Sequence, residues 1–145
     1  MDVLTAMKIS SSALKAERAR INISAMNLAN ANTTRTIDGG PYKAKSVVFA
    51  AKPLDGVNFR DTLNSTTERL RQVEVVEVVE DQAPFKEVYD PNHPDADANG
   101  IVKLPNVNVV EQMTDIMSAK RAYEANVTAL DAAKNMALKA LDIGR

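Results

Sequence analysis

The sequence predicts an α+β fold in which long N- and C-terminal helices pair as a coiled-coil-like rod and carry a small β-rich middle domain. All six prolines lie between Pro41 and Pro105, so both flanks lack the residue that interrupts helices most strongly. Apolar residues recur at helical spacing in both flanks, whereas runs of β-branched residues lie between them. We therefore expect an N-terminal axial helix over 1–34, a β-rich domain over 35–107 with a Pro/Asp loop at 90–105, and a C-terminal axial helix over 108–145.

The first flank has the period of a helix that packs on one side. Its apolar seam repeats every seven residues, and a second heptad series is poor because Ser11 and Arg18 occupy it. Three asparagines lower its helix propensity further, so this helix is weak on its own. The run NANTT at residues 30–34 is a natural stop. The side chains predicted to pair are Leu4, Met7, Leu14, Ile21 and Leu28.

The middle segment contains two candidate strands. Residues 42–51 (YKAKSVVFAA) and 70–79 (LRQVEVVEVV) are rich in β-branched residues, although the valine spacing of the second also permits a helix. This β-rich body is short for burying a large core alone, so the helices or neighbouring chains should cover one of its faces.

The second flank carries two stripes of residues at helical spacing. The first consists of larger side chains and the second mostly of alanine, which allows another backbone to approach closely. We expect the first stripe to pack on the N-terminal helix and the second to meet a neighbouring chain; an ordinary three-helix bundle is the alternative. The larger stripe includes Met113, Ile116, Tyr123, Val127, Leu130 and Leu141, and the alanine stripe includes Ala122, Asn126, Ala129, Ala133 and Ala140.

Composition excludes several classes of function. The net charge of −1 provides no general attraction for nucleic acid or anionic membranes, and no segment is apolar enough for membrane insertion. The chain has no cysteine, so it has no disulfide, thiolate zinc site or cysteine nucleophile. We predict no nucleic-acid partner and no cofactor.

Catalytic and metal-binding patterns are equally scarce. The only histidine, His93, lies in a proline-flanked loop, and no serine has the surroundings of a hydrolase nucleophile. Residues 95–100 (DADANG) copy the first half of an EF-hand loop, but the ninth position is Lys103 and the twelfth is Asn106, where calcium requires glutamate. We read this segment as a turn built on Asp and Asn side chains, and predict no catalytic residues and no metal site.

Both termini resemble a known family. Residues 12–22 (SALKAERARIN), 25–33 (AMNLANANT) and 121–126 (RAYEAN) are similar to the terminal signatures of bacterial flagellar rod, hook and hook-associated proteins. Residues 40–43 (GPYK) and 93–108 (HPDADANGIVKLPNVN) resemble those of proximal rod proteins in particular, with Ile101 where an aromatic residue often follows the glycine. The signature residues are Asn27, Leu28, Ala29, Asn30, Arg121, Tyr123, Glu124 and Asn126.

The resemblance implies a structural role. It implies a subunit of the flagellar basal-body rod that polymerises with itself, with other proximal and distal rod proteins and with the rod-to-ring adaptor. Such a subunit is exported by the flagellar type III apparatus without a cleaved signal, lies in the part of the rod that spans the periplasm, and transmits motor torque to hook and filament. The alternatives are another proximal rod subunit within the family, or a non-flagellar helical adaptor with a coiled coil.

Overall fold

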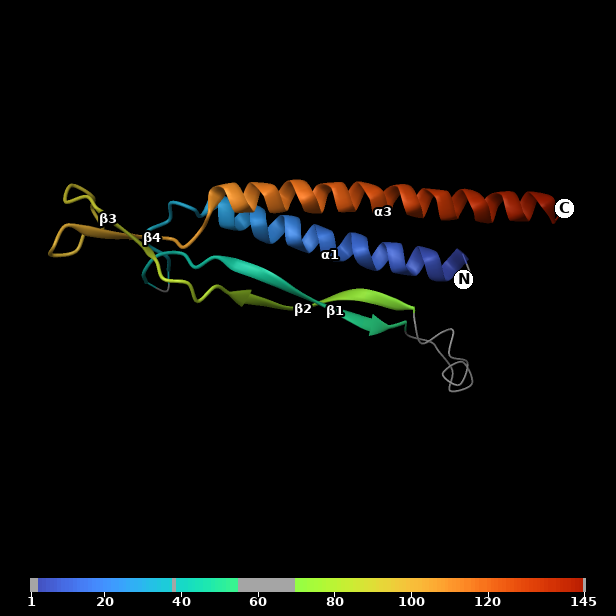
Figure 1. The fold of residues 1–145 in the computed structure, drawn as a ribbon, viewed down its shortest axis with the longest axis horizontal. Helices are drawn as coiled ribbons and strands as arrows, with labels where there is room; N and C mark the ends of the chain where they lie inside the picture. The colour runs from blue at the N-terminus through green and yellow to red at the C-terminus, as the bar shows by residue number, and fades with distance from the viewer. Residues whose placement is uncertain (1–2, 38, 55–69, 145) are drawn as a thin grey trace. The chain divides into compact units, whose positions relative to one another are not determined.

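The computed structural model describes residues 3–37, 39–54 and 70–144. The elements in chain order are helix α1 (Val3–Ala29), strands β1 (Lys45–Pro53), β2 (Arg71–Glu80), β3 (Lys86–Tyr89) and β4 (Ile101–Leu104), and helix α3 (Val109–Ile143) (Figure 1). Two long terminal helices with antiparallel strands between them make the predicted α+β fold.

The chain forms two compact units, each assembled from separate segments. Unit 1 comprises residues 1–19, 48–77 and 119–145, and unit 2 comprises residues 20–47 and 78–118. Both long helices and the β1–β2 pair therefore contribute to both units. The three-part division predicted along the sequence remains a prediction.

The helices begin and end where their sequences change character. α1 ends at Ala29, immediately before the predicted stop, and Asn30 and Thr33 continue it into turns. The Asn108 carbonyl accepts the first helical hydrogen bond of α3 from the Gln112 amide at 3.0 Å. The glycine-free stretch that follows allows α3 to continue for 35 residues, as far as Ile143.

The two helices run antiparallel where they meet in unit 2. Arg20 contacts Asp115 at 2.8 Å, and Asn27, further along α1, contacts Gln112, which is earlier on α3. In unit 1 the first half of α1 lies against β2, since the Ser12 hydroxyl accepts a hydrogen bond from the Val73 amide at 3.1 Å. No stretch of either described helix is apolar enough to cross a membrane.

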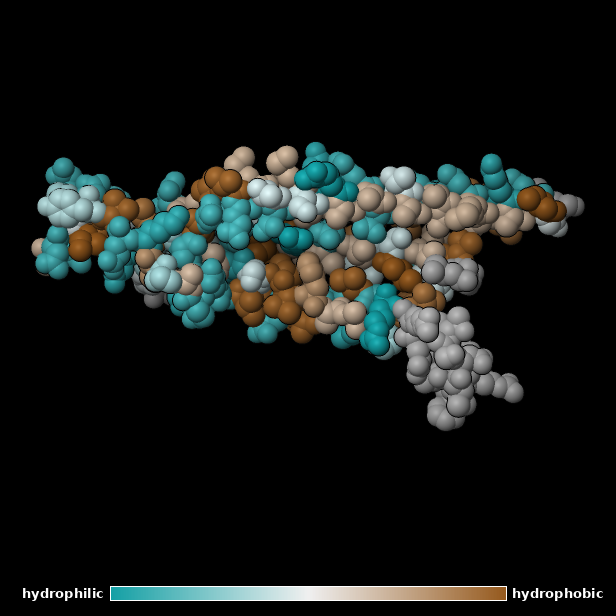
Figure 2. All heavy atoms as spheres, viewed as in Figure 1, coloured by the Kyte–Doolittle hydropathy of each residue, from teal (hydrophilic) through white to brown (hydrophobic). Residues whose placement is uncertain are grey.

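The strands form two separate two-stranded sheets. β1 pairs with β2, which agrees with the two predicted strands, and apolar side chains gather on the surface around this pair (Figure 2). β3 pairs antiparallel with β4 in the register Lys86 with Leu104 and Tyr89 with Ile101. This second hairpin was not predicted; β4 occupies the end of the expected loop at 90–105.

Gly100 closes the β3–β4 hairpin, and its backbone requires glycine. Its φ of +75° lies in the left-handed region, and an added Cβ would stand 3.0 Å from the Tyr89 ring. Asp97 forms the predicted Asp/Asn turn, because its carboxylate accepts hydrogen bonds from the Asn99 and Ile101 amides at 2.9 and 3.1 Å. The turn interpretation of this segment is therefore confirmed.

The buried side chains of the described residues are few and mostly small. Burying an alanine removes little apolar surface from water, so these contacts stabilise the fold less than a core of leucine and phenylalanine would. The buried apolar residues are Ala16, Ala119 and Ala133 in unit 1, and Tyr42, Ala44, Val102 and Val107 in unit 2.

Candidate functional site

A buried asparagine joins three segments of unit 2. Asn27 on α1 is 1% exposed. Its amide nitrogen donates to the Lys45 carbonyl at 2.7 Å and to the Gln112 side-chain oxygen at 2.9 Å. Its oxygen accepts from the Tyr42 hydroxyl and from the Lys45 amide, both at 2.9 Å. One side chain thus connects α1, the beginning of β1 and the first turn of α3.

Asparagine matches this site because of its hydrogen-bonding inventory. The side-chain amide offers two donors and two acceptor lone pairs, and Asn27 uses all of them. A buried polar group that is fully paired stabilises one arrangement of its neighbours, whereas an unpaired group there is costly. We call Asn27 and its partners Tyr42, Lys45 and Gln112 the asparagine lock.

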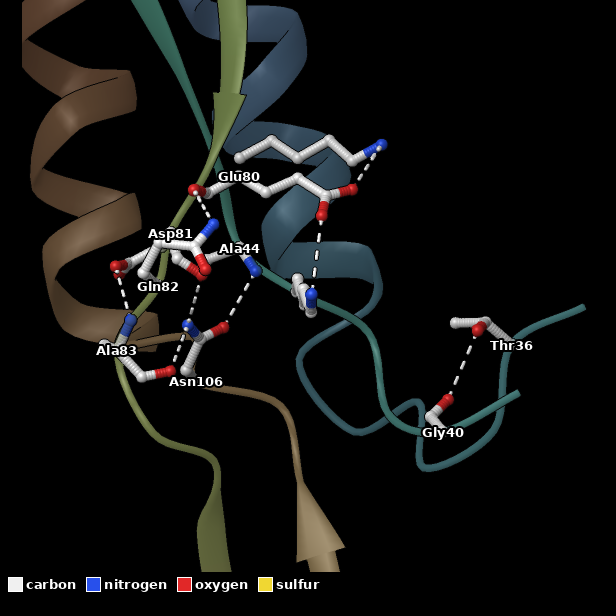
Figure 3. A network of polar contacts seen from close by, with 10 residues as sticks. Thr36, Gly40, Ala44, Glu80, Asp81, Gln82, Ala83 and Asn106 are labelled. Carbon is white, nitrogen blue, oxygen red and sulfur yellow. Dashed lines mark hydrogen bonds and ion pairs between the residues drawn. The ribbon is translucent and has the colours of Figure 1, made fainter. Parts of the chain in front are cut away.

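A second asparagine, Asn106, also joins separate segments of the chain by hydrogen bonds. The Asn106 side chain accepts a hydrogen bond from the Ala44 amide at 2.8 Å and donates to the carbonyls of Asp81 and Ala83 at 3.3 and 3.1 Å (Figure 3). The Ala44 carbonyl in turn accepts from the Asp81 amide at 2.8 Å. Asn106 therefore fixes the chain before α3 to the segments next to β1 and β2.

Charged side chains lie next to the asparagine lock but contribute little to its stability. Glu80 lies 3.7 Å from the Lys43 amine and 3.8 Å from that of Lys45, but these side chains are about a third to a half exposed, so the ion pairs add little stability. Burial raises the pKa of Tyr42, and the Glu80 carboxylate raises it further. The Tyr42 hydroxyl therefore keeps its proton and remains a donor to Asn27 at neutral pH.

The predicted helix-pairing side chains are unevenly buried. Met7, Leu14, Ile21 and Leu28 of α1 and Ile116, Ala122, Asn126, Val127 and Leu130 of α3 are half-buried. Ala133 is 3% exposed. Leu4, Met113, Tyr123, Ala129, Ala140 and Leu141 are exposed.

The two α3 stripes are each buried in part, and which of them meets a neighbouring chain remains a prediction. Ala133 belongs to the alanine stripe, which was expected to face a neighbour, yet it is buried within unit 1, as is Ala119. Leu141 of the larger stripe is instead 71% exposed. The covered side of α3 lies between the stripes, because alanine is small enough for the chain's own segments to approach closely there.

The signature residues have different structural roles. Asn27 is the centre of the asparagine lock, Leu28 is half-buried, and Ala29 is exposed. The Asn30 and Asn126 amides donate to helix carbonyls four residues earlier, at 2.9 Å each. Glu124 lies 3.8 Å from Lys120. Tyr123 and Arg121 are exposed on α3.

Three residues that join the two polar networks through their side chains were missing from the predicted sites. Tyr42 and Asn106 lie inside the GPYK and HPDADANGIVKLPNVN runs, so the signal was present but not assigned to these side chains. Gln112 had no signal, because its role depends on a contact with Asn27 across 85 positions of sequence. Among the described residues, no group of three or more His, Cys, Asp or Glu side chains could hold a metal ion.

Comparison with known proteins assigns the family. Residues 7–35 match a family model described as flagella basal body rod protein, and residues 98–143 match the C-terminal model of the flagellar basal body rod FlgEFG proteins. The chain is 44% identical over 145 residues to the flagellar basal-body rod protein FlgC of Salmonella typhimurium, with 100% of both chains covered. It is 41% identical to FlgC of Bacillus subtilis, again with 100% of both covered, and 40% identical to FlgC of Borreliella burgdorferi, with 99% and 98% covered. The chain belongs to the FlgC family.

FlgC membership confirms the resemblance seen in the sequence. As a member of this family the chain is a structural subunit of the flagellar basal-body rod, and the family is not one of enzymes. Both matched segments contribute to the asparagine lock: Asn27 lies in the first and Gln112 in the second. The contact between them connects the two parts of the chain that FlgC shares with other rod proteins.

Proposed function

We propose that this FlgC-family chain polymerises with itself and with other proximal and distal rod proteins into the periplasmic drive shaft that transmits torque to hook and filament. The observation that carries the proposal is the combination of the asparagine lock with unpaired helix surfaces. The lock fixes α1 against α3 in unit 2, while large apolar side chains of α3 remain outside any core. Met136 is 59% exposed, Leu141 71% and Ile143 86%.

Exposed apolar helix surfaces favour an assembly role. Large apolar side chains gathered on the surface of a soluble protein mark contacts with other molecules. Unlike a closed dimer, a rod requires each subunit to offer different surfaces to different neighbours. The terminal helices, with exposed positions on several sides of α3, provide such surfaces. The rod-to-ring adaptor is a further expected partner on the same basis.

The small core supports export through the flagellar type III apparatus. A chain passing through a narrow channel must unfold readily, and a core built largely from alanine and valine resists unfolding weakly. Helices that bury little of their own surface become stable when neighbours cover them. The chain would therefore gain most of its order on joining the rod, where it acts as a structural part without catalysis.

Complementation of a deletion strain tests the proposal. Deleting the gene should abolish swimming and leave basal bodies without a complete rod, and the wild-type gene should restore both. Leu141→Glu should be produced and exported but fail to complete the rod, because it places a charge on an apolar contact surface. Asn135→Glu, at an exposed polar position of the same helix, is the matched control and should complement.

The same experiment can contradict the proposal. A deletion strain with normal motility and intact rods in electron micrographs of isolated basal bodies would refute a rod function. Purified protein that forms only a closed dimer when mixed with other rod subunits, measured by light scattering, would favour the adaptor alternative.

A further inference from the structure

An open groove lies in unit 1 between α1 and β2. Its volume is about 960 Å³, and its residues come from α1, β1, β2 and α3. Most of its lining surface is apolar, and the apolar side chains include Met7 on α1, Val73 and Val75 on β2, and Leu130 on α3. A groove of this composition suits a helix whose contact face is apolar or small.

The groove also carries an unbalanced positive charge. Lys8 and Lys15 of α1 and Lys52 of β1 line it, and among the described residues of the lining the only acidic one is Glu74. Glu74 already forms an ion pair with Lys52. Lys8 and Lys15 are exposed and form no ion pair within the part of the chain that the structure describes. Seven residues separate them, so they stand on one face of α1 about 10 Å apart.

One exposed face of α3 has the complementary pattern. Glu124 and Asp131 are both exposed and are also seven residues apart, with Thr128 between them on the same face. Glu124 also has an exposed contact with Lys120 of its own helix at 3.8 Å. The spacing of the two acids thus equals that of Lys8 and Lys15, and the residues between them on this face are small enough to enter a groove.

This acidic face cannot occupy the groove of its own chain. Leu130 points to the groove, and at 100° per residue Glu124 and Asp131 lie roughly 100° or more around α3 from it. Both acids are exposed on α3 and are therefore accessible to cations on another molecule. Because the two surfaces differ, such a contact repeats head to tail, as the contacts of an open helical assembly do.

We propose that the groove binds the Glu124–Thr128–Asp131 face of α3 from a second copy of this chain, with the acids opposite Lys8 and Lys15. The proposal rests on the rod function and identifies one contact within the polymer. The contact is held by charge complementarity at the rim and by apolar and small side chains along the lining.

Charge reversal provides the first test, in the deletion strain used above. Lys8→Glu with Lys15→Glu should abolish swimming, and so should Glu124→Lys with Asp131→Lys, because each places like charges opposite one another. A chain carrying all four changes should swim again. Arg35→Glu with Lys103→Glu, at two exposed basic positions in unit 2 outside both faces, is the control and should swim normally.

Cysteine cross-linking provides a second test that does not depend on how the charge variants fold. The chain has no cysteine, so a chain with Ser11→Cys and a chain with Thr128→Cys can be co-expressed with one thiol each. Oxidation of isolated rods should give a disulfide-linked dimer that needs both variants. Thr114→Cys, two heptads earlier on α3, replaces Thr128→Cys in the control and should give none.

The outcomes separate this contact from the rod function itself. Motility that depends on the gene, combined with no recovery in the fourfold variant and no dimer from Ser11→Cys with Thr128→Cys, would overturn the contact but leave the rod function standing. Cross-linking of Ser11→Cys only to a different rod protein would overturn it as well. Normal motility in the deletion strain would refute the rod function instead.

Discussion

Replacing Asn27 with alanine should weaken the contact between α1 and α3 in unit 2. The substitution removes four hydrogen bonds and leaves behind the Tyr42 hydroxyl, the Lys45 amide and carbonyl, and the Gln112 side chain. The half-buried Lys45 and Gln112 can recover some bonds to water, so about two buried groups lose their partners. At roughly 1–3 kcal/mol for each group, the variant should lose about 2–6 kcal/mol of stability.

Hydrogen exchange at single amides measures this loss where it occurs. The Lys45 amide donates directly to Asn27, so its exchange reports the opening of the asparagine lock. A loss of about 2–6 kcal/mol corresponds to exchange faster by roughly thirty-fold to about twenty-thousand-fold, since each 1.4 kcal/mol is a factor of about ten. The Ala44 amide, which donates to Asn106, should respond less.

Asn30→Ala is the matched control on the same helix. Asn30 donates to the Met26 carbonyl and accepts from Thr33, both within its own turn of the chain. Its loss should cost about 1 kcal/mol or less, because water can reach these groups. If Asn27→Ala and Asn30→Ala changed the exchange of the Lys45 amide equally, the buried network would not hold the helices, and the reasoning would fail.

Three further predictions follow from the described contacts. Ala133→Leu should lower the stability of the free chain by about 1–3 kcal/mol through overpacking, whereas Ala129→Leu, at an exposed position, should change it little in urea unfolding. Burial and a nearby carboxylate raise the pKa of Tyr42 above 10.0, so the stability it contributes is complete below pH 10 and falls as the pH rises through the raised value. Tyr42→Phe should lose about 1 kcal/mol at pH 7 with the Asn27 hydrogen bond, and should lack this alkaline loss, when unfolding is compared across pH. Asp95→Ala with Asp97→Ala should loosen the hairpin turn yet leave calorimetric calcium titrations unchanged; micromolar binding abolished by the double substitution would contradict the turn interpretation.

The secondary structure was predictable where local signals were strong. The absence of proline and glycine predicted α1 and α3, and β-branched residues predicted β1 and β2. The strands β3 and β4 contain only four residues each, next to a proline-rich turn, and depend on pairing with each other. Such short strands leave no period in the sequence, so they could not be recognised from residue pattern alone.

The polar site was predictable only in part. The signature drew attention to Asn27, but its three partner residues lie 15 to 85 positions away, and no local rule connects them. Periodicity on α3 likewise identified two candidate stripes without showing which side would be covered. That choice was decided by the close approach possible at Ala119 and Ala133, which is a property of the folded chain.

The asparagine lock and the exposed apolar helix surfaces serve two different needs of a rod subunit: a fixed helix register and contacts with neighbouring subunits. A core of small apolar side chains tolerates sliding of one helix along another, since alanine and valine contacts are similar in several registers. A shift of α1 by one residue along α3 would rotate Asn27 by about 100° away from Tyr42, Lys45 and Gln112. Their polar groups would then lose their hydrogen-bond partner. A fully paired buried amide therefore selects one register at a cost in desolvation, as single polar residues do in coiled coils. With the register fixed in this way, the stability of the polymer can depend on contacts between subunits while each subunit still presents its helix faces in one defined arrangement.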